Sequence, residues 1–186
     1  MIRLAHSGGY TPSDQASLLA KVRACVHPLG GTAMNLRVSR RAIEFDLFCQ
    51  PDTELHPFLT APESIGAVLT SRRLDLPPVP VVPSEIIAEA RTLFNEERYW
   101  EVHEVLEGLW KKVTGQEKQL LQGLILVAAA LVHAQKNERK VVEPLLEDAA
   151  HRLENQPSTY YGLDVRRFLR HLKKVITAKT LHFPTI

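Results

Sequence analysis

The side chains best suited to chemistry lie in one short run, RYWEVHEVLEGLW. Residues four and seven apart share a face of a helix, so His103, Glu107 and Trp110 fall on one stripe. Apolar Tyr99 and Leu106 are expected beside them, which predicts that this face is buried. A buried polar group without a partner costs about 1–3 kcal/mol. The imidazole and the carboxylate must therefore pair inside the protein or bind a ligand or a metal.

A second polar stripe is predicted on the helix that follows. Gln122 and His133 are eleven residues apart, close to three full turns, and apolar residues separate them. A buried helix that keeps an amide and an imidazole on one face must satisfy both groups. The economical arrangement directs His103 and Glu107 toward Gln122 or His133 and forms a polar cluster between two helices.

These residue types are suited to a divalent metal, because imidazole and carboxylate are good ligands for zinc, manganese, iron or nickel. His103 and Glu107 can hold one ion from a single helix, but two protein ligands are too few. His133, Glu104 or a subunit partner must supply a third. We therefore predict a site for a divalent ion with His103, Glu107 and His133 as ligands, and a ligand pocket made by Tyr99, Glu104, Trp110 and Gln122.

Two other interpretations use the same residues. A carboxylate that fixes the tautomer of His103 would make it a base for acid–base catalysis. Alternatively, a His–Glu hydrogen bond could hold two helices in register with no chemistry. The spacing alone favours this structural role over metal binding, and metal binding over catalysis. Because position 107 is Glu, the run is not the H-E-x-x-H motif of zinc proteases. Whether the protein is an enzyme is left open.

The elements that position these residues belong to a predicted all-α bundle of about five helices, spanning residues 84–186. Short connections favour antiparallel neighbours. Ser84 is expected to cap the first helix, Gly115 to end the motif helix, and Asp164 to cap the last. Pro144 should kink the fourth helix or mark its first turn. The predicted helices are Glu85–Asn95, Arg98–Thr114, Gln116–Lys136, Glu138–Asn155 and Leu163–Ala178, and the last has a basic surface at Arg166, Arg167, Arg170, His171, Lys173 and Lys174.

A different pattern covers residues 1–76, before a Pro-rich linker at residues 77–83. Helical spacing over Ser13–His27 is followed by two alternating runs, and Met34, Leu36 and Val38 are expected on one face of the first run. The order β-α-β-β-α-β predicts a small α+β domain of the ferredoxin-like type. Its elements are expected at Ile2–Ala5, Ser13–His27, Thr32–Val38, Ala42–Cys49, Leu55–Gly66 and Ala67–Leu76.

The bulk composition excludes several classes of protein. The net charge of +2 gives no strong field toward nucleic acid or an acidic membrane. The longest apolar run, Leu124–Val132, is shorter than the roughly 20 residues that span a bilayer, and the N-terminus does not resemble a secretory signal. Cys25 and Cys49 lack the spacing of a redox motif. We expect a cytoplasmic protein without a membrane partner. Nucleic-acid binding through the basic last helix is a third and weaker interpretation, and a homo-oligomer is one way in which a partner subunit could supply a further ligand.

A longer stretch around the motif resembles a known family. The run LFNEERYWEVHEVLEGLWKKVTGQEKQLLQGLILVAAALVHAQKNERK is similar to bacterial and archaeal domain-of-unknown-function family 309. His103, Glu107 and Trp110 match its H-x-x-x-E-x-x-W/Y motif, and the QGLI run of Gln122–Ile125 and His133 also follow its pattern. The resemblance covers about Ser84–Leu172 and implies a small helical bundle.

The resemblance implies little about activity. The family motif has been suggested to bind metal. With this resemblance, a metal or ligand role and a structural role for the His–Glu cluster are equally supported. Glu97 departs from the pattern, where a glycine is expected in the turn before Tyr99. We therefore predict a two-domain protein whose bundle binds a metal or a small ligand. The alternative is a non-catalytic interaction or assembly module in which the His–Glu cluster is structural.

Overall fold

A computed structural model describes residues 1–6, 9–74, 82–179, 183 and 186. The chain divides into two compact units, one of residues 1–77 with 135–137 and one of residues 78–134 with 138–186. We describe each unit by itself. The predicted Pro-rich linker at residues 77–83 lies outside the described residues, except for Val82 and Pro83.

The N-terminal unit is a four-stranded sheet with helices, in the predicted order β-α-β-β-α-β. Its strands lie in the order β2-β3-β1-β4, and all neighbouring strands are antiparallel. This order confirms the ferredoxin-like prediction. The strands are β1 (Ile2–Ala5), β2 (Thr32–Val38), β3 (Ala42–Phe48) and β4 (Val68–Ser71), and the helices are η1 (Pro12–Asp14), α1 (Gln15–Val26), η2 (His27–Leu29), α2 (His56–Thr60) and η3 (Ala61–Ser64).

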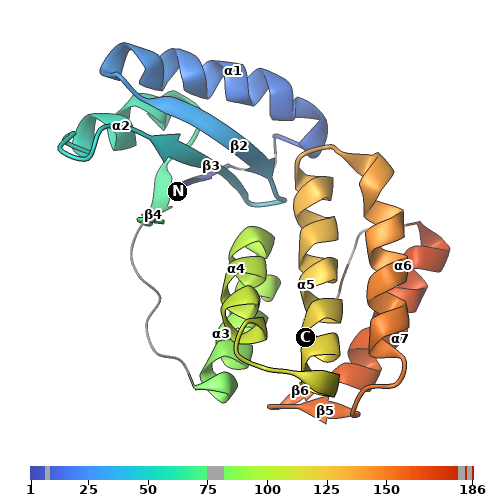
Figure 1. The fold of residues 1–186 in the computed structure, drawn as a ribbon. Coiled ribbons are helices and arrows are strands. Elements are labelled where there is room, and N and C mark those ends of the chain that lie inside the picture. Colours follow the sequence, from blue (N-terminus) through green and yellow to red (C-terminus); the bar gives the residue numbers. More distant parts are fainter. Residues whose placement is uncertain (7–8, 75–81, 180–182, 184–185) are drawn as a thin grey trace. The chain divides into compact units, whose positions relative to one another are not determined.

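The core of this unit lies between one face of the sheet and its helices (Figure 1). Leu18 and Val22 of α1 are fully buried, as are Leu4 of β1 and Phe45 of β3. Side chains alternate between the two faces of a strand, so the helical spacing of α1 and the two-residue spacing of β3 bury the same apolar layer.

One predicted strand face is wrong at Met34, which is 43% exposed while Leu36 and Val38 are buried. The pairing of β2 with β3 shifts register between Met34 and Arg37, and Asn35 has a φ of 51°. An extra residue in one strand of an antiparallel pair reverses which face the following side chains occupy. The bulge at Asn35 therefore places Ala33, rather than Met34, on the buried side with Leu36.

The helical unit contains the five predicted α-helices within the part of the chain described. In Figure 1, α5 runs between α4 and α6. Buried residues from all five helices form its core, which supports the all-α prediction. The elements are α3 (Pro83–Asn95), α4 (Tyr99–Trp110), α5 (Gly115–Gln135), η4 (Arg139–Val141), α6 (Val142–Leu153), a small hairpin of β5 (Thr159–Tyr160) and β6 (Leu163–Asp164), and α7 (Val165–Ala178).

Several helix ends differ from the prediction. Helix α3 begins at Pro83 rather than after a Ser84 cap, because proline lacks the N–H that a first helical position leaves unpaired. Helix α4 ends at Trp110, and Gly115, with a φ of 63°, is the first residue of α5. Pro144 lies in the first turn of α6, one of the two predicted outcomes. The predicted cap is confirmed at Asp164, whose side chain accepts a hydrogen bond from the Arg167 N–H.

Gly123 of α5 marks a close approach to α6. A Cβ at this position would lie 2.8 Å from Leu153 Cγ and 3.3 Å from the Ala149 carbonyl oxygen, whereas one at Gly108 would meet nothing within 4 Å. We expect Gly123→Ala to lower the free energy of unfolding by about 1–3 kcal/mol through overpacking. Gly108→Ala should raise it by about 0.5–1 kcal/mol, because alanine loses less backbone entropy in a helix. Denaturant unfolding followed by circular dichroism measures both, and equal shifts would contradict the packing argument.

Helix α7 has one apolar and one basic face, as predicted. Phe168 and Leu172 are buried, and the charged side chains of the basic face are exposed. His171 is the exception within that face, since it is partly buried. Its pKa lies below the ordinary value, first because burial disfavours the charged ring and then because Arg167, Lys174 and Arg170 are positive.

Because the pKa of His171 is lowered in the folded protein, the protein becomes less stable as the pH falls. When pH falls through about 6.5, His171 gains a proton in the unfolded chain before it does so in the folded one. Protonation then favours unfolding, so stability is complete above this pH and declines below it. We expect His171→Gln to flatten the decline in unfolding free energy between about pH 7.5 and 5. A decline in His171→Gln as steep as in the wild type would contradict this explanation.

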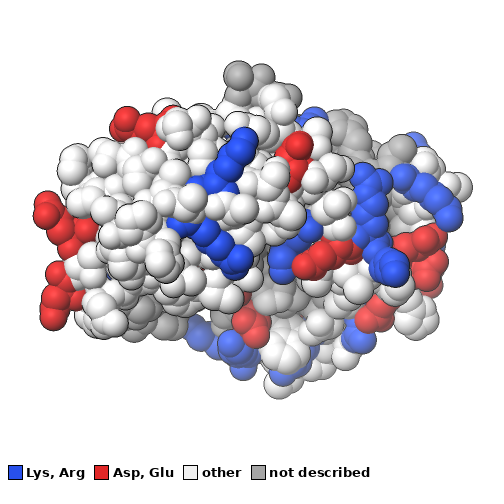
Figure 2. All heavy atoms as spheres, turned by 90° about the horizontal axis from the view of Figure 1, so that it is seen from above, with Lys and Arg blue, Asp and Glu red and all other residues white. Residues whose placement is uncertain are grey.

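Neither sign of charge dominates the face that Figure 2 displays. Figure 2 shows basic and acidic side chains interspersed over the face that it displays. This mixture agrees with 23 basic and 21 acidic residues in the chain. Within the described residues, no helix combines the length and apolar character that crossing a bilayer requires.

Candidate metal centre

Helix α4 presents two faces, and the predicted motif lies at the edge of the buried one. Val102, Leu106 and Leu109 are buried in the core of the helical unit. The side chains of His103 and Glu107 are 32% and 35% exposed. The prediction of a buried polar stripe is therefore corrected: successive helical residues are about 100° apart, so His103 lies beside the core face set by Val102 and not within it. A ligand from solution can reach these side chains.

Within the described residues, one group has three side chains suited to holding an ion: His103, Glu104 and Glu107. Each offers one ligand atom, and these atoms all lie within 4.8 Å of one another. His103 Nδ1 is 3.3 Å from Glu104 Oε1. Ligand atoms held at about 2.1 Å from one ion are themselves roughly 3.0–3.4 Å apart. The His103–Glu104 distance already lies in that range, and the three ligand atoms together lie within a slightly wider spacing.

Lys111 lies next to this group, and Lys118 lies next to Trp110. Lys111, the residue that follows the end of α4, has its Nζ 3.3 Å from Glu107 Oε1. Lys118 Nζ of α5 lies 4.0 Å from the centre of the Trp110 ring, a cation–π geometry. The Trp110 Nε1 atom is buried and has no hydrogen-bond partner within the described part of the chain. Trp110, predicted as a wall, thus joins the end of α4 to α5.

The structure does not bring every predicted site residue into the group. His133 Nδ1 on α5 pairs with the Glu138 carboxylate. Tyr99 is 9% exposed and packs edge-on against Phe94, with ring centres 5.3 Å apart, so it belongs to the core. Gln122 is partly buried on α5 and is not a member of the group. Of the three candidates for a third ligand, the structure places Glu104 beside His103 and Glu107.

The sequence reasoning missed the residue that anchors the start of α4. Glu101 is completely buried, and its two oxygens accept hydrogen bonds from Arg98 Nε at 2.7 Å and Nη2 at 2.9 Å. These bonds are the main reason why the pKa of Arg98 lies above its ordinary value. The spacing of Arg98 and Glu101, three residues apart, was the available signal.

The turn before α4 also explains the unusual residue at position 97. Glu97 has a φ of 61°, in the left-handed region that glycine adopts at least cost. Helix α3 ends at Asn95, two residues before Glu97, so this residue lies in the turn and not in the helix. The glycine expected here from the family pattern would fit the same backbone without strain.

His103 and Glu107 form an i, i+4 pair of histidine and carboxylate at the accessible edge of a five-helix unit, and Glu104 adds a second carboxylate beside them. The unit is therefore a helical bundle with a candidate metal centre. The family described as Domain of unknown function (DUF309) matches residues 87–145, which contain all of α4 and α5. Through this helical part, the chain belongs to that family.

One solved structure is similar to about half of the chain. It is a conserved hypothetical protein from Thermus thermophilus that is 41% identical, and the alignment covers 49% of this chain and 95% of that one, with a TM-score of 0.43. The comparison with curated proteins gave no significant match. Neither the description of the family nor that of this relative assigns an activity, so function must be argued from the site.

Proposed function

We propose that the helical unit binds a divalent cation through His103, Glu104 and Glu107. The observation that supports this most directly is that an imidazole nitrogen and two carboxylate oxygens lie within 4.8 Å of one another. Their accessibility argues against the alternative of a sealed structural cluster, since about a third of the His103 and Glu107 side chains is exposed. A cluster whose main task was to hold helices in register would be expected to close on protein partners.

The charges of the group favour a cation. Glu104 and Glu107 are three residues apart on α4, so two like charges share one side of a helical turn. Their repulsion is relieved when a doubly charged ion lies between them. Lys111 now supplies part of that relief through Glu107. A bound ion would take over this role and would release Lys111 to solvent.

The donor types narrow the choice of ion. Imidazole suits zinc, iron and nickel, while carboxylates extend the range toward manganese. Three ligands from one helical turn would occupy one side of the ion and leave its other positions for water or a ligand. The proposal is thus an open site on an exposed helix rather than a closed structural one.

The proposal is tested by equilibrium dialysis of the full chain against Zn²⁺, Mn²⁺ and Ni²⁺ after treatment with chelator, with metal analysis of both compartments. We expect about one ion per chain. Mn²⁺ should also broaden the amide resonances of α4 around His103 in an NMR titration. No retained ion, together with no broadening near His103, would refute the proposal. Broadening centred on His133 and Glu138 would place the ion at that pair instead.

Removing the neighbouring lysine should strengthen the site. In Lys111→Gln, a positive charge 3.3 Å from Glu107 is lost, and with it the competitor for that carboxylate. We expect the affinity for Mn²⁺ or Zn²⁺ to rise by roughly two- to fivefold, the size of an exposed ion pair. Lys112→Gln, in which the changed lysine is also exposed, is the matched control. Calorimetric titration measures both, and unchanged affinity in Lys111→Gln would place Glu107 outside the coordination sphere.

A further inference from the structure

The basic side chains of α7 fall into two groups. Lys173 Nζ is 2.7 Å from Glu154 Oε1, and Lys179, the residue after the helix, has its Nζ 3.6 Å from Glu143 Oε1. These two lysines are therefore paired with acidic residues of α6 and its C-terminal end. The other group is exposed and, within the described residues, its side chains form no ion pair; it consists of Arg166, Arg167, Arg170 and Lys174. We call this group the unpaired basic face.

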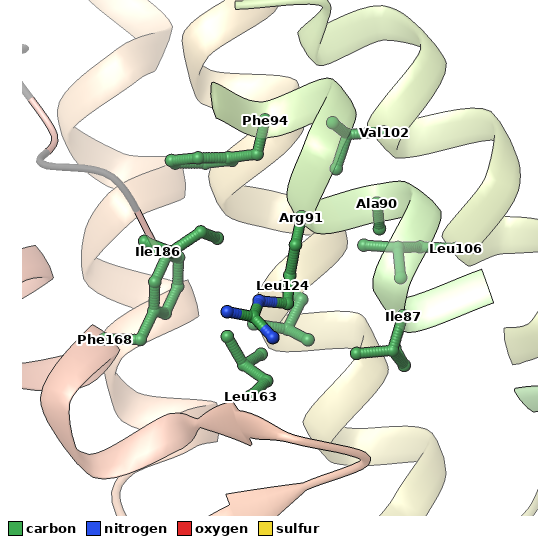
Figure 3. A pocket seen from close by; sticks show the side chains of 10 residues that line it. All are labelled: Ile87, Ala90, Arg91, Phe94, Val102, Leu106, Leu124, Leu163, Phe168 and Ile186. Carbon is green, nitrogen blue, oxygen red and sulfur yellow. The ribbon is translucent and has the colours of Figure 1, made fainter. Parts of the chain in front are cut away.

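The unpaired basic face lies opposite the side of α7 that packs in the core. Successive helical residues are about 100° apart, so Arg166, Arg170 and Lys174 follow one another at intervals of about 6 Å along the axis. On the other side, Phe168 is buried with its ring centre 5.8 Å from that of Phe94 (Figure 3). The cations thus form a continuous strip that faces solvent.

Helix stability does not account for this placement of charge. Arg166 and Arg167 lie in the first turn of α7, where the helix dipole disfavours cations, and the last turn has no basic residue. Arg170 forms like-charge i, i+4 pairs with Arg166 and Lys174, and such pairs destabilise a helix. An anionic partner would relieve this repulsion.

The packing of α7 argues against a membrane as that partner. A basic amphipathic helix binds a bilayer by inserting its apolar face. Here Phe168 and Leu172 are already buried in the helical unit, so this face is not available. Three of the four cations are arginines, whose planar guanidinium matches the oxygens of a phosphate.

An exposed aromatic ring lies in the turn that leads into α7. Tyr161 joins β5 to β6 and is 49% exposed, and β6 continues directly into the helix. Arg91 of α3 holds this turn, since its Nη1 donates to the Gly162 carbonyl oxygen at 3.3 Å. Figure 3 shows the Arg91 side chain extending toward Leu163 of β6. Cations beside an exposed aromatic ring are the combination that binds single-stranded nucleic acid, because the bases stack on the ring.

We propose that the unpaired basic face binds the phosphate backbone of single-stranded nucleic acid and that Tyr161 stacks on one of its bases. Contacts to phosphates carry no sequence information, so binding is independent of sequence. The near-neutral charge of the whole chain does not oppose this, because the four cations act on phosphates at close range. The inference does not depend on metal binding at His103.

The test is fluorescence anisotropy of a labelled oligouridylate of about ten nucleotides, titrated with the full chain in EDTA. Between about 50 and 200 mM salt, we expect the logarithm of the binding constant to fall with that of the salt concentration at a slope of roughly −3. Each of four neutralised phosphates contributes about −0.7. Polyglutamate of the same length and vesicles containing phosphatidylserine should compete poorly. Absence of binding at about 50 mM salt, or equal competition by either, would overturn the proposal.

Matched variants locate the contact on α7. Arg170→Gln should weaken binding several-fold and reduce the magnitude of the slope by about 0.7, because one phosphate contact is lost. Arg139→Gln changes an exposed arginine outside α7 and should bind like the wild type. Circular dichroism confirms that each variant folds. Equal binding by Arg170→Gln and Arg139→Gln would refute the assignment to this face.

A second pair of variants tests the stacking contact. Tyr161→Ala should weaken binding by about fivefold or more and leave the salt slope unchanged, since a ring and no charge is removed. Tyr161→Phe keeps the ring and should bind like the wild type. If Tyr161→Ala binds as tightly as Tyr161→Phe, the aromatic ring does not contact the strand.

Discussion

His103→Ala should lower the affinity of the protein for Zn²⁺ or Mn²⁺ by roughly 100-fold or more. Loss of a residue that only supports a metal ligand already costs about 10–100-fold, and here the one nitrogen donor of the group is removed. The carboxylates of Glu104 and Glu107 would remain, so weak binding of hard ions should persist while preference for zinc declines. Calorimetric titration of each ion measures the change.

The controls for this prediction come from the same unit. His151 lies on α6 with 84% of its side chain exposed, and His151→Ala should leave metal affinity unchanged. For the carboxylates, Glu107→Gln should weaken binding, whereas Glu147→Gln on the exposed surface of α6 should not. If His103→Ala and His151→Ala bind equally well, the ion is not held at the candidate centre.

Glu101→Ala is expected to be the most destabilising of the acidic substitutions in α4, at about 3 kcal/mol. The Glu101 side chain is completely buried, and Arg98, its bidentate partner, is only 21% exposed. Removing Glu101 leaves the partly buried Arg98 without its two bonds to that carboxylate and with Glu96 Oε2, 2.9 Å from its Nη1, as the remaining acidic partner. The change also removes a negative charge from the first turn of α4, where it stabilises the positive end of the helix dipole. Denaturant unfolding measures the loss.

Glu104→Ala provides the comparison, because Glu104 lies on the same helix with 44% of its side chain exposed. Surface substitutions usually change stability by no more than about 0.5 kcal/mol. Arg98→Lys should also be costly, since an ammonium cannot reproduce the two parallel hydrogen bonds. Equal stability of Glu101→Ala and Glu104→Ala would show that the buried pair contributes nothing net.

Periodicity predicted the elements of both units well, because it reports which side of each element is buried. It failed where local backbone geometry interrupts a regular element. The bulge at Asn35 reverses the face of Met34, and no spacing rule reveals an inserted residue. The β5–β6 hairpin was missed because its strands have two residues each, too few to show alternation. Its turn at Tyr161 and Gly162 has positive φ at both residues.

The candidate site was predicted in part. The i, i+4 spacing of His103 and Glu107 follows from helix geometry alone, so the sequence was sufficient to pair them. Glu104, and not His133, lies beside His103 and Glu107. This depends on how α5 is rotated against α4 and on Glu138, which pairs with His133.

The sequence was sufficient for the α-helices and the four strands of the first sheet, for their order, for the family of the helical half and for placing His103 and Glu107 on one side of α4. These features depend on local spacing, which one helix or strand expresses without its neighbours. The accessibility of the His103 stripe, and the burial of Glu101 rather than another acid of α4, follow from packing between helices. The burial and the hydrogen-bond partners of a side chain are set where elements distant in sequence meet. They therefore decide which residues of a sequence pattern come together as a site.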